Sequence, residues 1–387
     1  MRITLLANPD NLHVQRWIEF LAGRGHALTL ITDPFTRARP AACEIHVIRW
    51  NPLTKLLAFR LTPRPLGNDR WKHLHARPLV RRSRPDVVHG FEAFNWGLAT
   101  ALAGPYPRVL TPWGNDVFEI PGRWPLARRM IGRALRSVDA ISTNDETLAP
   151  YLAREFGVDP ARVHGFTWGV DPGLFHAELP TEAADWRRRL EIPAGAPVIL
   201  SPRNFHPYWG SEQICGAIPR VLRRVPAAVF VILKGLGGDA AAFAEARRRL
   251  AAEGHGAALR WLAEPLAPRE MAALFNLADA FISVPKTDLL AQTILEGMAC
   301  GCFPVLGDRP AYRKHLRPGE NGLLVEDETP QALAAALLVA LANDTLRTNA
   351  RHENPRLIAA EENWQLNAQR MEAVYQTAIE RFGRSAG

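Results

Sequence analysis

The sequence has no apolar run long enough to cross a membrane. Its longest unbroken apolar run is ALAAALLVALA, residues 332–342, and these eleven residues are about half of the roughly 20 that a transmembrane helix needs. The opening residues, MRITLLANPDNLH, turn polar after six or seven positions and contain no apolar stretch of the kind found in secretion signals. These two features predict a cytoplasmic protein.

Cysteine and metal-ligand patterns are also sparse. The four cysteines show no CxxC pair and no regular spacing, which favours reduced, packed thiols over a disulfide framework or a metal site (Cys43, Cys215, Cys300 and Cys302). No Asp-x-Asp pair occurs, and no group of His, Asp or Cys has the spacing of metal ligands. We therefore expect neither a metal ion nor a cofactor.

Acidic residues are scarce between Arg49 and Arg84, where Asp69 is the one acid among ten Lys or Arg residues. Apolar and aromatic residues alternate with these cations, which is typical of a surface for acidic lipid head groups (Trp50, Leu53, Leu56, Leu57, Phe59 and Trp71). A solvated loop and helix face is the alternative. The net charge of +8 indicates an anionic partner without distinguishing nucleotide, membrane surface or nucleic acid.

A length of 387 residues is about twice that of a usual domain, and a composition of 47% hydrophobic and 22% charged residues is typical of a folded protein. Short apolar runs alternate with helical patterns from the first residues. ITLLA precedes a segment in which Trp17, Ile18 and Leu21 recur at helical spacing, and ALTLIT follows Gly25, an expected C-cap. This order predicts parallel βαβ units.

A second series of strands, including PVILSPR, AVFVILKG and ADAFISVP, begins after the Pro- and Gly-marked residues 171–197. The sequence thus predicts an α/β protein with two doubly wound, Rossmann-like domains facing an interdomain cleft, because open sheets bind ligands at the carboxyl ends of their strands. We place the amino-terminal domain at 1–172 and the carboxy-terminal domain at 173–362. Residues 363–387 should form a helix that packs back on the first domain.

The stretch TDLLAQTILEGMACG, residues 287–301, predicts a buried helix that begins at Leu289 and ends before Gly301. Asp288 lies where an N-cap lies, and capping alone would account for it. Glu296 lies among apolar residues, where an unpaired carboxylate would be costly, so it needs a partner. A spacing of eight residues is about 12 Å along a helix and about 80° around it. The two acids could therefore reach both ends of one extended ligand.

The first amides of this predicted helix, at Leu289, Leu290 and Ala291, would present the positive end of the helix dipole to a phosphate. An acid, a row of amides and a second acid form a suitable order of groups for a sugar, a diphosphate and a ribose. This order predicts a nucleotide-sugar donor.

The acid-x7-Glu pattern, followed by GMACGCFPVLGDRP and GENGLLVED, resembles the donor site of the retaining glycosyltransferases of family 4, which have the GT-B fold. The resemblance covers nearly the whole chain, since HVQRWIEFLAGRGHALTLIT, DVVHGFEAFNWGLATAL, LTPWGNDVF and GVDPGLF are similar to earlier blocks of that family. It implies that Asp288 contacts the transferred sugar and Glu296 the nucleotide ribose. The donor-binding residues around them are then Leu289, Leu290, Ala291 and Thr293. The resemblance also implies that the domain 1–172 binds the acceptor and the domain 173–362 binds the donor.

SPRNFHPYWG resembles the strand end that presents the phosphate-binding arginine of the family, here Arg203, whereas the usual lysine of the family aligns with Trp209. Lys234, in VILKGLGG, ends the next strand beside Gly235, in a turn that lets a phosphate approach the backbone. We expect Lys234 to supply the second cation; a surface salt bridge is the alternative for it.

On the acceptor side, the loop ANPDNLH lacks the paired glycines of the family, and we expect Asn11 and His13 to line the site there. In TPWGND, Trp113 takes the place of a histidine of many relatives, as either a stacking platform for a sugar or a packed core residue, while Asp116 is retained. His89, at the tip of the strand DVVHG, is predicted to face the acceptor.

The resemblance implies transfer of a hexose from a nucleotide diphosphate sugar to a glycan or lipid-linked hydroxyl, with retention and without a metal ion. Arg203, Lys234 and the helix amides would stabilise the departing diphosphate. The expected context is cell-envelope or exopolysaccharide synthesis, in the cytoplasm or on the inner face of the membrane. A nucleotide-sugar epimerase of the same fold and a non-catalytic anionic-surface binding protein are the alternatives; a nucleic-acid partner is not expected, because a simple basic binder has no use for the donor residues.

Overall fold

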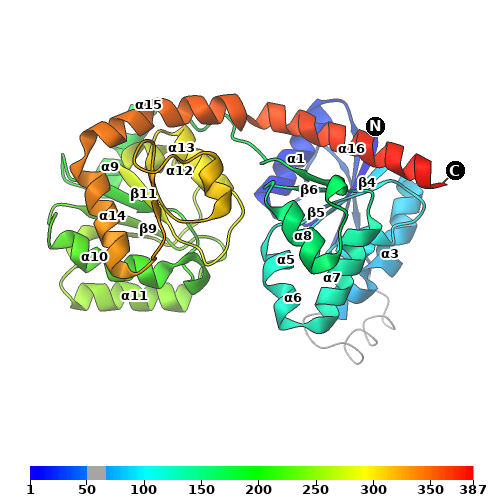
Figure 1. The fold of residues 1–387 in the computed structure, drawn as a ribbon, viewed down its shortest axis with the longest axis horizontal. Helices are drawn as coiled ribbons and strands as arrows, with labels where there is room; N and C mark the ends of the chain where they lie inside the picture. The colour runs from blue at the N-terminus through cyan, green and yellow to red at the C-terminus, as the bar shows by residue number, and fades with distance from the viewer. Residues whose placement is uncertain (50–66, 387) are drawn as a thin grey trace. The chain divides into compact units, whose positions relative to one another are not determined.

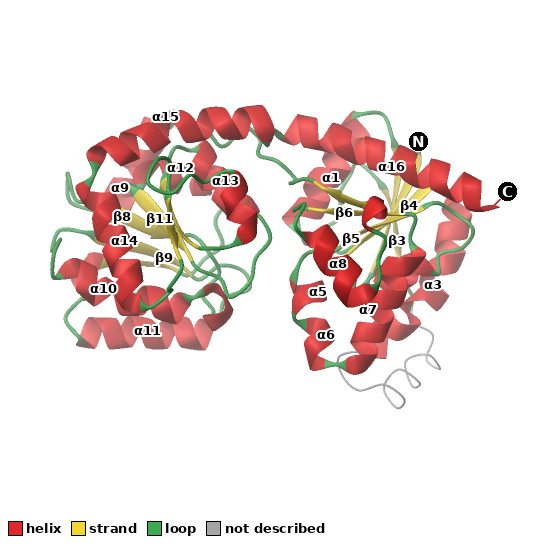
Figure 2. Cartoon of the chain, viewed as in Figure 1, coloured by secondary structure: helices red, strands yellow, loops and turns green. Residues whose placement is uncertain are grey.

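The computed structural model describes residues 1–49 and 67–386, which divide into two compact units (Figure 1). The first unit comprises Met1–Thr167 and Asn367–Gly387, and the second comprises Trp168–Leu366. Both bounds lie close to those predicted, after residue 172 and at residue 363. In each unit the strands form a central layer with helices around it (Figure 2).

The first unit contains a seven-stranded parallel sheet in the order β3-β2-β1-β4-β5-β6-β7. β1 and β4, near the middle, are rich in apolar residues and are almost completely buried, as expected when helices cover both faces of a parallel sheet. The strands are β1 Arg2–Leu6, β2 Ala27–Thr32, β3 Glu44–Val47, β4 Val87–Phe91, β5 Arg108–Thr111, β6 Ala140–Thr143 and β7 Val163–Gly165.

The helices of this unit follow the predicted apolar spacing. In α1 the residues Val14, Trp17, Ile18 and Leu21 are buried, and Gly25 follows the helix end with a φ of 80°, in the left-handed region that favours glycine. The helices are α1 Leu12–Gly23, α3 Gly67–Ser83, α4 Gly97–Ala101, α5 Asn115–Phe118, α6 Ile120–Arg123, α7 Pro125–Ser137 and α8 Leu148–Phe156; α16 spans Trp364–Ala386.

The carboxy-terminal helix α16 is tied to the first unit by polar contacts. The Glu372 carboxylate accepts hydrogen bonds from Arg24 Nη2 at 2.9 Å and pairs with His26 Nε2 at 2.8 Å. Tyr375 is completely buried and contacts His89 of β4. The last residues of the chain therefore complete the core of the unit that contains its first residues.

The second unit contains a six-stranded parallel sheet in the order β10-β9-β8-β11-β12-β13. Its strands are β8 Val198–Ser201, β9 Val229–Leu233, β10 Leu259–Leu262, β11 Ala280–Ser283, β12 Phe303–Gly307 and β13 Leu323–Val325. The helices are α9 Pro180–Arg189, α10 Ser211–Leu222, α11 Ala240–Ala252, α12 Pro268–Leu277, α13 Gln292–Ala299, α14 Pro330–Ala342 and α15 Asp344–Glu361.

Both sheets have the doubly wound strand order of Rossmann folds, in which the chain starts near the middle, moves to one edge and then returns to build the other. The predicted fold class, two Rossmann-like α/β domains, is confirmed. None of the helices within the described residues is both long and apolar enough to cross a bilayer.

Candidate active site

Polar side chains of the second unit follow neighbouring strands at the point where each strand ends. Arg203 follows β8, Lys234 follows β9, Asp288 follows β11 and Arg309 follows β12. The carboxyl ends of parallel strands lie at one edge of the sheet, and ligands of doubly wound folds bind there. The structure thus brings Arg203 and Lys234, predicted from the sequence, to the same edge as Asp288.

Asp288 links two residues that are distant in sequence. Its Oδ2 accepts a hydrogen bond from Arg203 Nη1 at 2.9 Å and another from the Tyr312 hydroxyl, also at 2.9 Å. The Arg203 and Asp288 side chains are only 10% and 12% exposed, and Tyr312 is completely buried. Burial raises the pKa of the Asp288 carboxyl, whereas Arg203 and Tyr312 act in the opposite direction. The carboxylate therefore holds the Arg203 guanidinium in one orientation.

The Arg203 guanidinium also packs over an aromatic ring. Its Cζ lies 4.1 Å from the centroid of Trp209, which belongs to the 3-10 turn Pro207–Trp209. A guanidinium over an indole is a favourable cation–π arrangement. Trp209, at the position of the lysine of the family, thus supports Arg203 and does not supply a second cation.

Two further contacts fix this turn to the segment before Asp288. Lys286 N donates to Tyr208 O at 2.9 Å, and the Tyr208 hydroxyl lies 2.7 Å from Thr287 Oγ1. The loops that follow β8 and β11 are consequently linked through both backbone and side chains. Arg203 and Asp288 meet because these loops are joined.

The predicted start of the helix after Asp288 is wrong. α13 begins at Gln292, with Ala291 as its N-cap, so Asp288 precedes the helix and does not cap it. Leu289 and Leu290 instead lie in a non-helical segment and are 5% and 3% exposed. Packing of these two leucines in the core before the helix begins accounts for the difference.

Because α13 begins at Gln292, the spatial relation between the two acids and the set of amides at the helix N-terminus differ from those predicted. The predicted 12 Å and 80° relationship of Asp288 and Glu296 does not apply, because only Glu296 is helical. The amides of Leu289, Leu290 and Ala291 are not those of the first helical turn, which starts with Gln292 and Thr293. Thr293, predicted as a donor-binding residue, lies in the first turn of the helix.

Glu296 lies within α13 and is half-buried, next to the completely buried Leu295. Burial raises the pKa of the Cys300 thiol, and the charge of Glu296 raises it further. Cys300 is a buried free cysteine, as the sequence predicts for a packed thiol.

Lys234 leads into a tight glycine turn. Gly235 has a φ of 72°, and a Cβ there would lie 2.0 Å from Asn204 Oδ1, so only glycine fits. Phe205 N donates to Lys234 O at 2.8 Å, which holds the turn against the residues after Arg203. Within the described ranges Lys234 forms no ion pair, which argues against the salt-bridge alternative.

Sequence reasoning missed Tyr312 and Arg309, although both follow the predicted strand CFPVLG in the segment DRPAYRK. The rule applied to Lys234, that a polar residue at the carboxyl end of a strand faces the ligand, could have found them. Arg309 Nη1 pairs with Glu328 Oε1 at 2.7 Å, and its Nη2 donates to the carbonyl of Pro285. Arg309 is thereby positioned beside the loop that ends in Asp288.

In the first unit, two of the predicted acceptor residues are held inside the fold. His89 is completely buried, with Nδ1 2.8 Å from the Tyr375 hydroxyl and Nε2 2.7 Å from Thr111 Oγ1. Burial lowers the pKa of His89 to about 3, so the ring is neutral. Both ring nitrogens are engaged, and the structure therefore does not expose His89 to an acceptor.

Asp116 is the second of these buried residues. Its Oδ2 accepts from Ala93 N at 2.6 Å, and its Oδ1 accepts from the amides of Trp113 and Gly114 at 3.0 and 2.9 Å. Burial raises the pKa of this carboxyl to about 6, against the effect of the backbone donors. Asp116 organises the loop that presents Trp113, which is half-buried.

Asn11 and His13 lie at the start of α1, immediately after the carboxyl end of β1. Asn11 Oδ1 accepts from His13 N at 2.8 Å and caps the helix. His13 is half-buried, and burial together with Arg16 lowers its pKa to about 3. Asn11, His13 and Trp113 thus all follow the carboxyl ends of strands in the first unit.

Family models match both units. Residues 2–145 match the model described as Glycosyl transferase 4-like, and residues 182–356 match the model described as Glycosyl transferases group 1.

Curated relatives agree with these matches. A D-inositol 3-phosphate glycosyltransferase of Acidothermus cellulolyticus is 29% identical over 216 residues, which are 54% of this chain and 48% of the relative. A D-inositol 3-phosphate glycosyltransferase of Jonesia denitrificans is 27% identical over 264 residues, 66% of this chain and 62% of the relative. The chain spans about half to three fifths of the length of these relatives.

Solved structures resemble the whole chain. Sucrose-phosphate synthase from Thermosynechococcus elongatus has a TM-score of 0.79 at 17% identity, covering 98% of this chain and 99% of that one. Anabaena Alr3699/HepE in complex with UDP and glucose has a TM-score of 0.76 at 15% identity, covering 97% of this chain and 100% of that one. At such identities the likeness concerns the fold. A glycosyl transferase model thus matches each of the two doubly wound units, which confirms the resemblance to glycosyl transferases predicted from the sequence, and the fold of the chain is GT-B.

Proposed function

We propose that the protein is a retaining glycosyltransferase that moves a hexose from a nucleotide diphosphate sugar to a hydroxyl of a glycan or lipid-linked acceptor. The observation that carries this proposal is the preorganised Arg203, held between Asp288 and Trp209 at the carboxyl end of β8. A solved neighbour described as a complex with UDP and glucose supports the class of donor.

The chemical step needs positive charge where the diphosphate departs. Negative charge grows on the leaving phosphate as the glycosidic bond breaks, and donors that are already oriented stabilise it without reorganisation. Within the described residues, Arg203 makes one side-chain hydrogen bond, to Asp288, so its other N–H groups remain for phosphate oxygens. Lys234 and the first amides of α13, at Gln292 and Thr293, supply the remaining donors.

The roles of the two acids differ in this proposal. Asp288 orients Arg203 and contacts the transferred sugar through its remaining oxygen, whereas Glu296 contacts the nucleotide ribose, as the family resemblance implies. Asn11, His13 and Trp113 of the first unit contribute to the acceptor side. Retention follows from the resemblance, with the leaving phosphate assisting deprotonation of the acceptor hydroxyl.

No metal ion takes part in the proposed reaction, because Arg203 and Lys234 supply the charge that a divalent cation would supply. The described part of the chain contains no group of three or more His, Cys, Asp or Glu side chains suited to a metal ion. Transfer that continues undiminished in excess chelator is the expected result.

The proposed acceptor is lipid-linked, as in envelope or exopolysaccharide synthesis on the inner face of the membrane. A polyol phosphate is a second acceptor class, supported by relatives named D-inositol 3-phosphate glycosyltransferases. Epimerisation of the donor is the competing reaction for the same fold.

The test is transfer from UDP-, GDP- and ADP-sugars, with the anomeric configuration of the product read by NMR. Arg203→Ala should lower turnover about 100- to 1000-fold, whereas Arg223→Ala, an exposed arginine of the same unit, should not change it. Near-normal turnover by Arg203→Ala would contradict the proposal. An isomerised sugar formed from donor alone would identify an epimerase, and an inverted product would exclude retention.

A further inference from the structure

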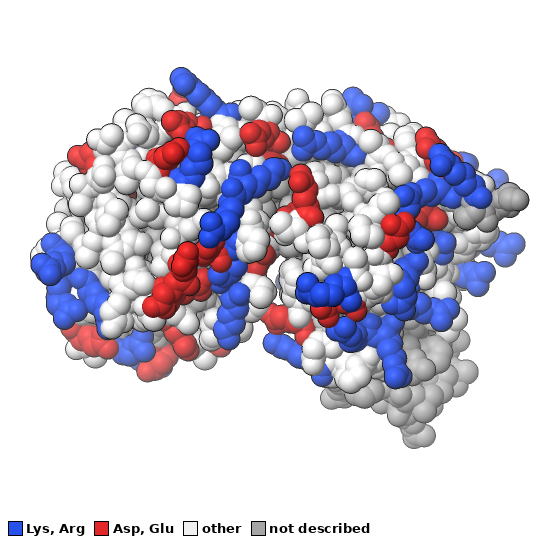
Figure 3. Space-filling model, viewed as in Figure 1, with Lys and Arg blue, Asp and Glu red and all other residues white. Residues whose placement is uncertain are grey.

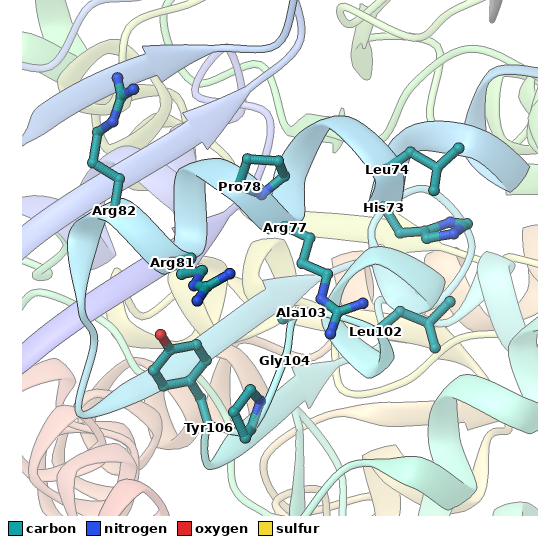
Figure 4. Close-up of a pocket in the computed structure, with 11 residues that line it drawn as sticks. His73, Leu74, Arg77, Pro78, Arg81, Arg82, Leu102, Ala103, Gly104 and Tyr106 are labelled. Atoms are coloured by element: carbon teal, nitrogen blue, oxygen red, sulfur yellow. The ribbon is translucent and has the colours of Figure 1, made fainter.

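A groove of about 930 Å³ lies on the first unit between α3 and residues 102–106, which connect α4 to β5 (Figure 4). Residues 102–106 immediately precede β5, so the groove lies at the amino ends of the strands. Asn11 and Trp113 follow the carboxyl ends of β1 and β5, at the opposite edge of the same sheet. The groove is therefore separate from the predicted acceptor residues.

The helix wall of the groove is basic. His73, Arg77 and Arg81 recur every four residues, which places them on one face of α3, and Arg82 lies beside them. Among the described residues, neither an ion pair nor a hydrogen bond involves the side chains of Arg77, Arg81 and Arg82, and the groove lining includes no Asp or Glu. Three exposed arginines without a counter-charge favour an anionic ligand.

The remainder of the lining is largely apolar. Leu74 is 47% exposed, and Leu102, Pro105 and Tyr106 form the facing wall. In Figure 4, Arg77 and Arg81 point from α3 toward this wall, whereas Arg82 points away from it. Cations that extend over leucine, proline and tyrosine suit an anion with an apolar portion better than a free phosphate or a nucleic-acid strand.

The first unit carries more positive than negative side chains on one of its faces. On the face shown in Figure 3, Lys and Arg side chains cover more of the first unit than Asp and Glu side chains do. The basic segment of the sequence, residues 49–84, contributes α3 to the groove, while its residues 50–66 lie outside the described residues. The groove supplies a defined binding surface within that segment.

We propose that this groove binds the phosphate head group of an anionic phospholipid in a bilayer, with Arg77 and Arg81 at the phosphate and Leu74, Leu102 and Tyr106 against the apolar part of the lipid. This binding requires neither donor nor acceptor and is independent of the transfer reaction. Its consequence would be a protein held at the membrane surface.

The experiment is co-sedimentation of the full chain with phosphatidylcholine vesicles, with and without phosphatidylglycerol, at low salt. We expect binding only to the anionic vesicles, weakening as salt screens the charges. Each arginine near an anionic surface contributes roughly fivefold to the partition coefficient, so Arg77→Ala/Arg81→Ala should lower it roughly 25-fold. Leu74→Gln, which leaves the charge unchanged, should lower it several-fold.

The matched control is Arg223→Ala/Arg224→Ala, which removes the same charge from two exposed arginines of the second unit and should bind vesicles like the parent. All these side chains are exposed, so equal thermal midpoints would show intact folding. Absence of vesicle binding by the parent, an equal loss in the control, or full binding by Arg77→Ala/Arg81→Ala would each overturn the proposal. Release of the protein from the vesicles by soluble glycerol phosphate would show a soluble anion site instead of a lipid site.

Discussion

Arg203 and Asp288 lie 85 residues apart in sequence, yet Arg203 Nη1 donates a hydrogen bond to Asp288 Oδ2 over 2.9 Å, and about a tenth of each side chain is exposed. The carboxylate also accepts from Tyr312, so one oxygen positions two side chains. A cation held in this manner meets a substrate phosphate without losing much conformational freedom.

Removing the carboxylate should destabilise the second unit and impair donor binding together. Asp288→Ala leaves a buried guanidinium and a buried hydroxyl without an acceptor, and we expect a loss of about 3 kcal/mol in the free energy of unfolding. Arg203→Ala/Asp288→Ala should lose less than the sum of the single variants, by about 0.5–3 kcal/mol. Urea unfolding of the three variants measures this coupling; additive losses would show that the contact contributes nothing.

Tyr312→Phe should test whether the positioning of Asp288 affects catalysis. The variant loses one hydrogen bond, which costs about 1 kcal/mol of stability. Turnover should fall, though less than in Arg203→Ala, because Arg203 keeps its bond to Asp288. Tyr151→Phe is the control, since its hydroxyl donates to Val117 O at 3.1 Å in the first unit. A steady-state comparison in which both variants keep full turnover would remove Tyr312 from the site.

Gly235→Ala should disturb the turn that presents Lys234. The added methyl group would meet Asn204 Oδ1 at 2.0 Å, and the φ of 72° is itself unfavourable for alanine. Gly254 has a φ of 84° with open space around it. Gly254→Ala therefore measures only the cost of placing alanine in this backbone conformation, about 1–2 kcal/mol. We expect Gly235→Ala to cost more than Gly254→Ala in denaturant unfolding and to raise KM for the donor. Equal costs would mean that Asn204 moves aside freely.

Buried His89 should make the first unit sensitive to acid. Its pKa is about 3 in the folded protein and 6.5 for the unperturbed side chain, so the unfolded chain binds the extra proton between these values. Its contribution to stability is complete above pH 6.5 and decreases by up to about 1.4 kcal/mol per pH unit below it. His89→Gln cannot take up this proton. The free energy of unfolding should therefore fall less between pH 7 and pH 5 in the variant than in the parent, and parallel curves would contradict the prediction.

Local periodicity was sufficient to predict the fold class. Strand and helix patterns alternate along the chain, and each reflects which residues of a short segment face the core, as in α1, where the predicted apolar positions are buried. The start of α13 could not be predicted in this way, because Leu289 and Leu290 suit a helix and a buried non-helical segment equally. Packing in the core decided between them.

The sequence by itself determined two doubly wound sheets and placed Arg203 and Lys234 at strand ends, since both follow from the order of short segments. Only the tertiary structure decided the partners of these residues. Asp288 meets Tyr312, 24 residues later, and His89 meets Tyr375, 286 residues later, because loops and a terminal helix that are distant in sequence pack together. Hydrogen bonds between such side chains depend on the packed core, which a linear pattern does not contain.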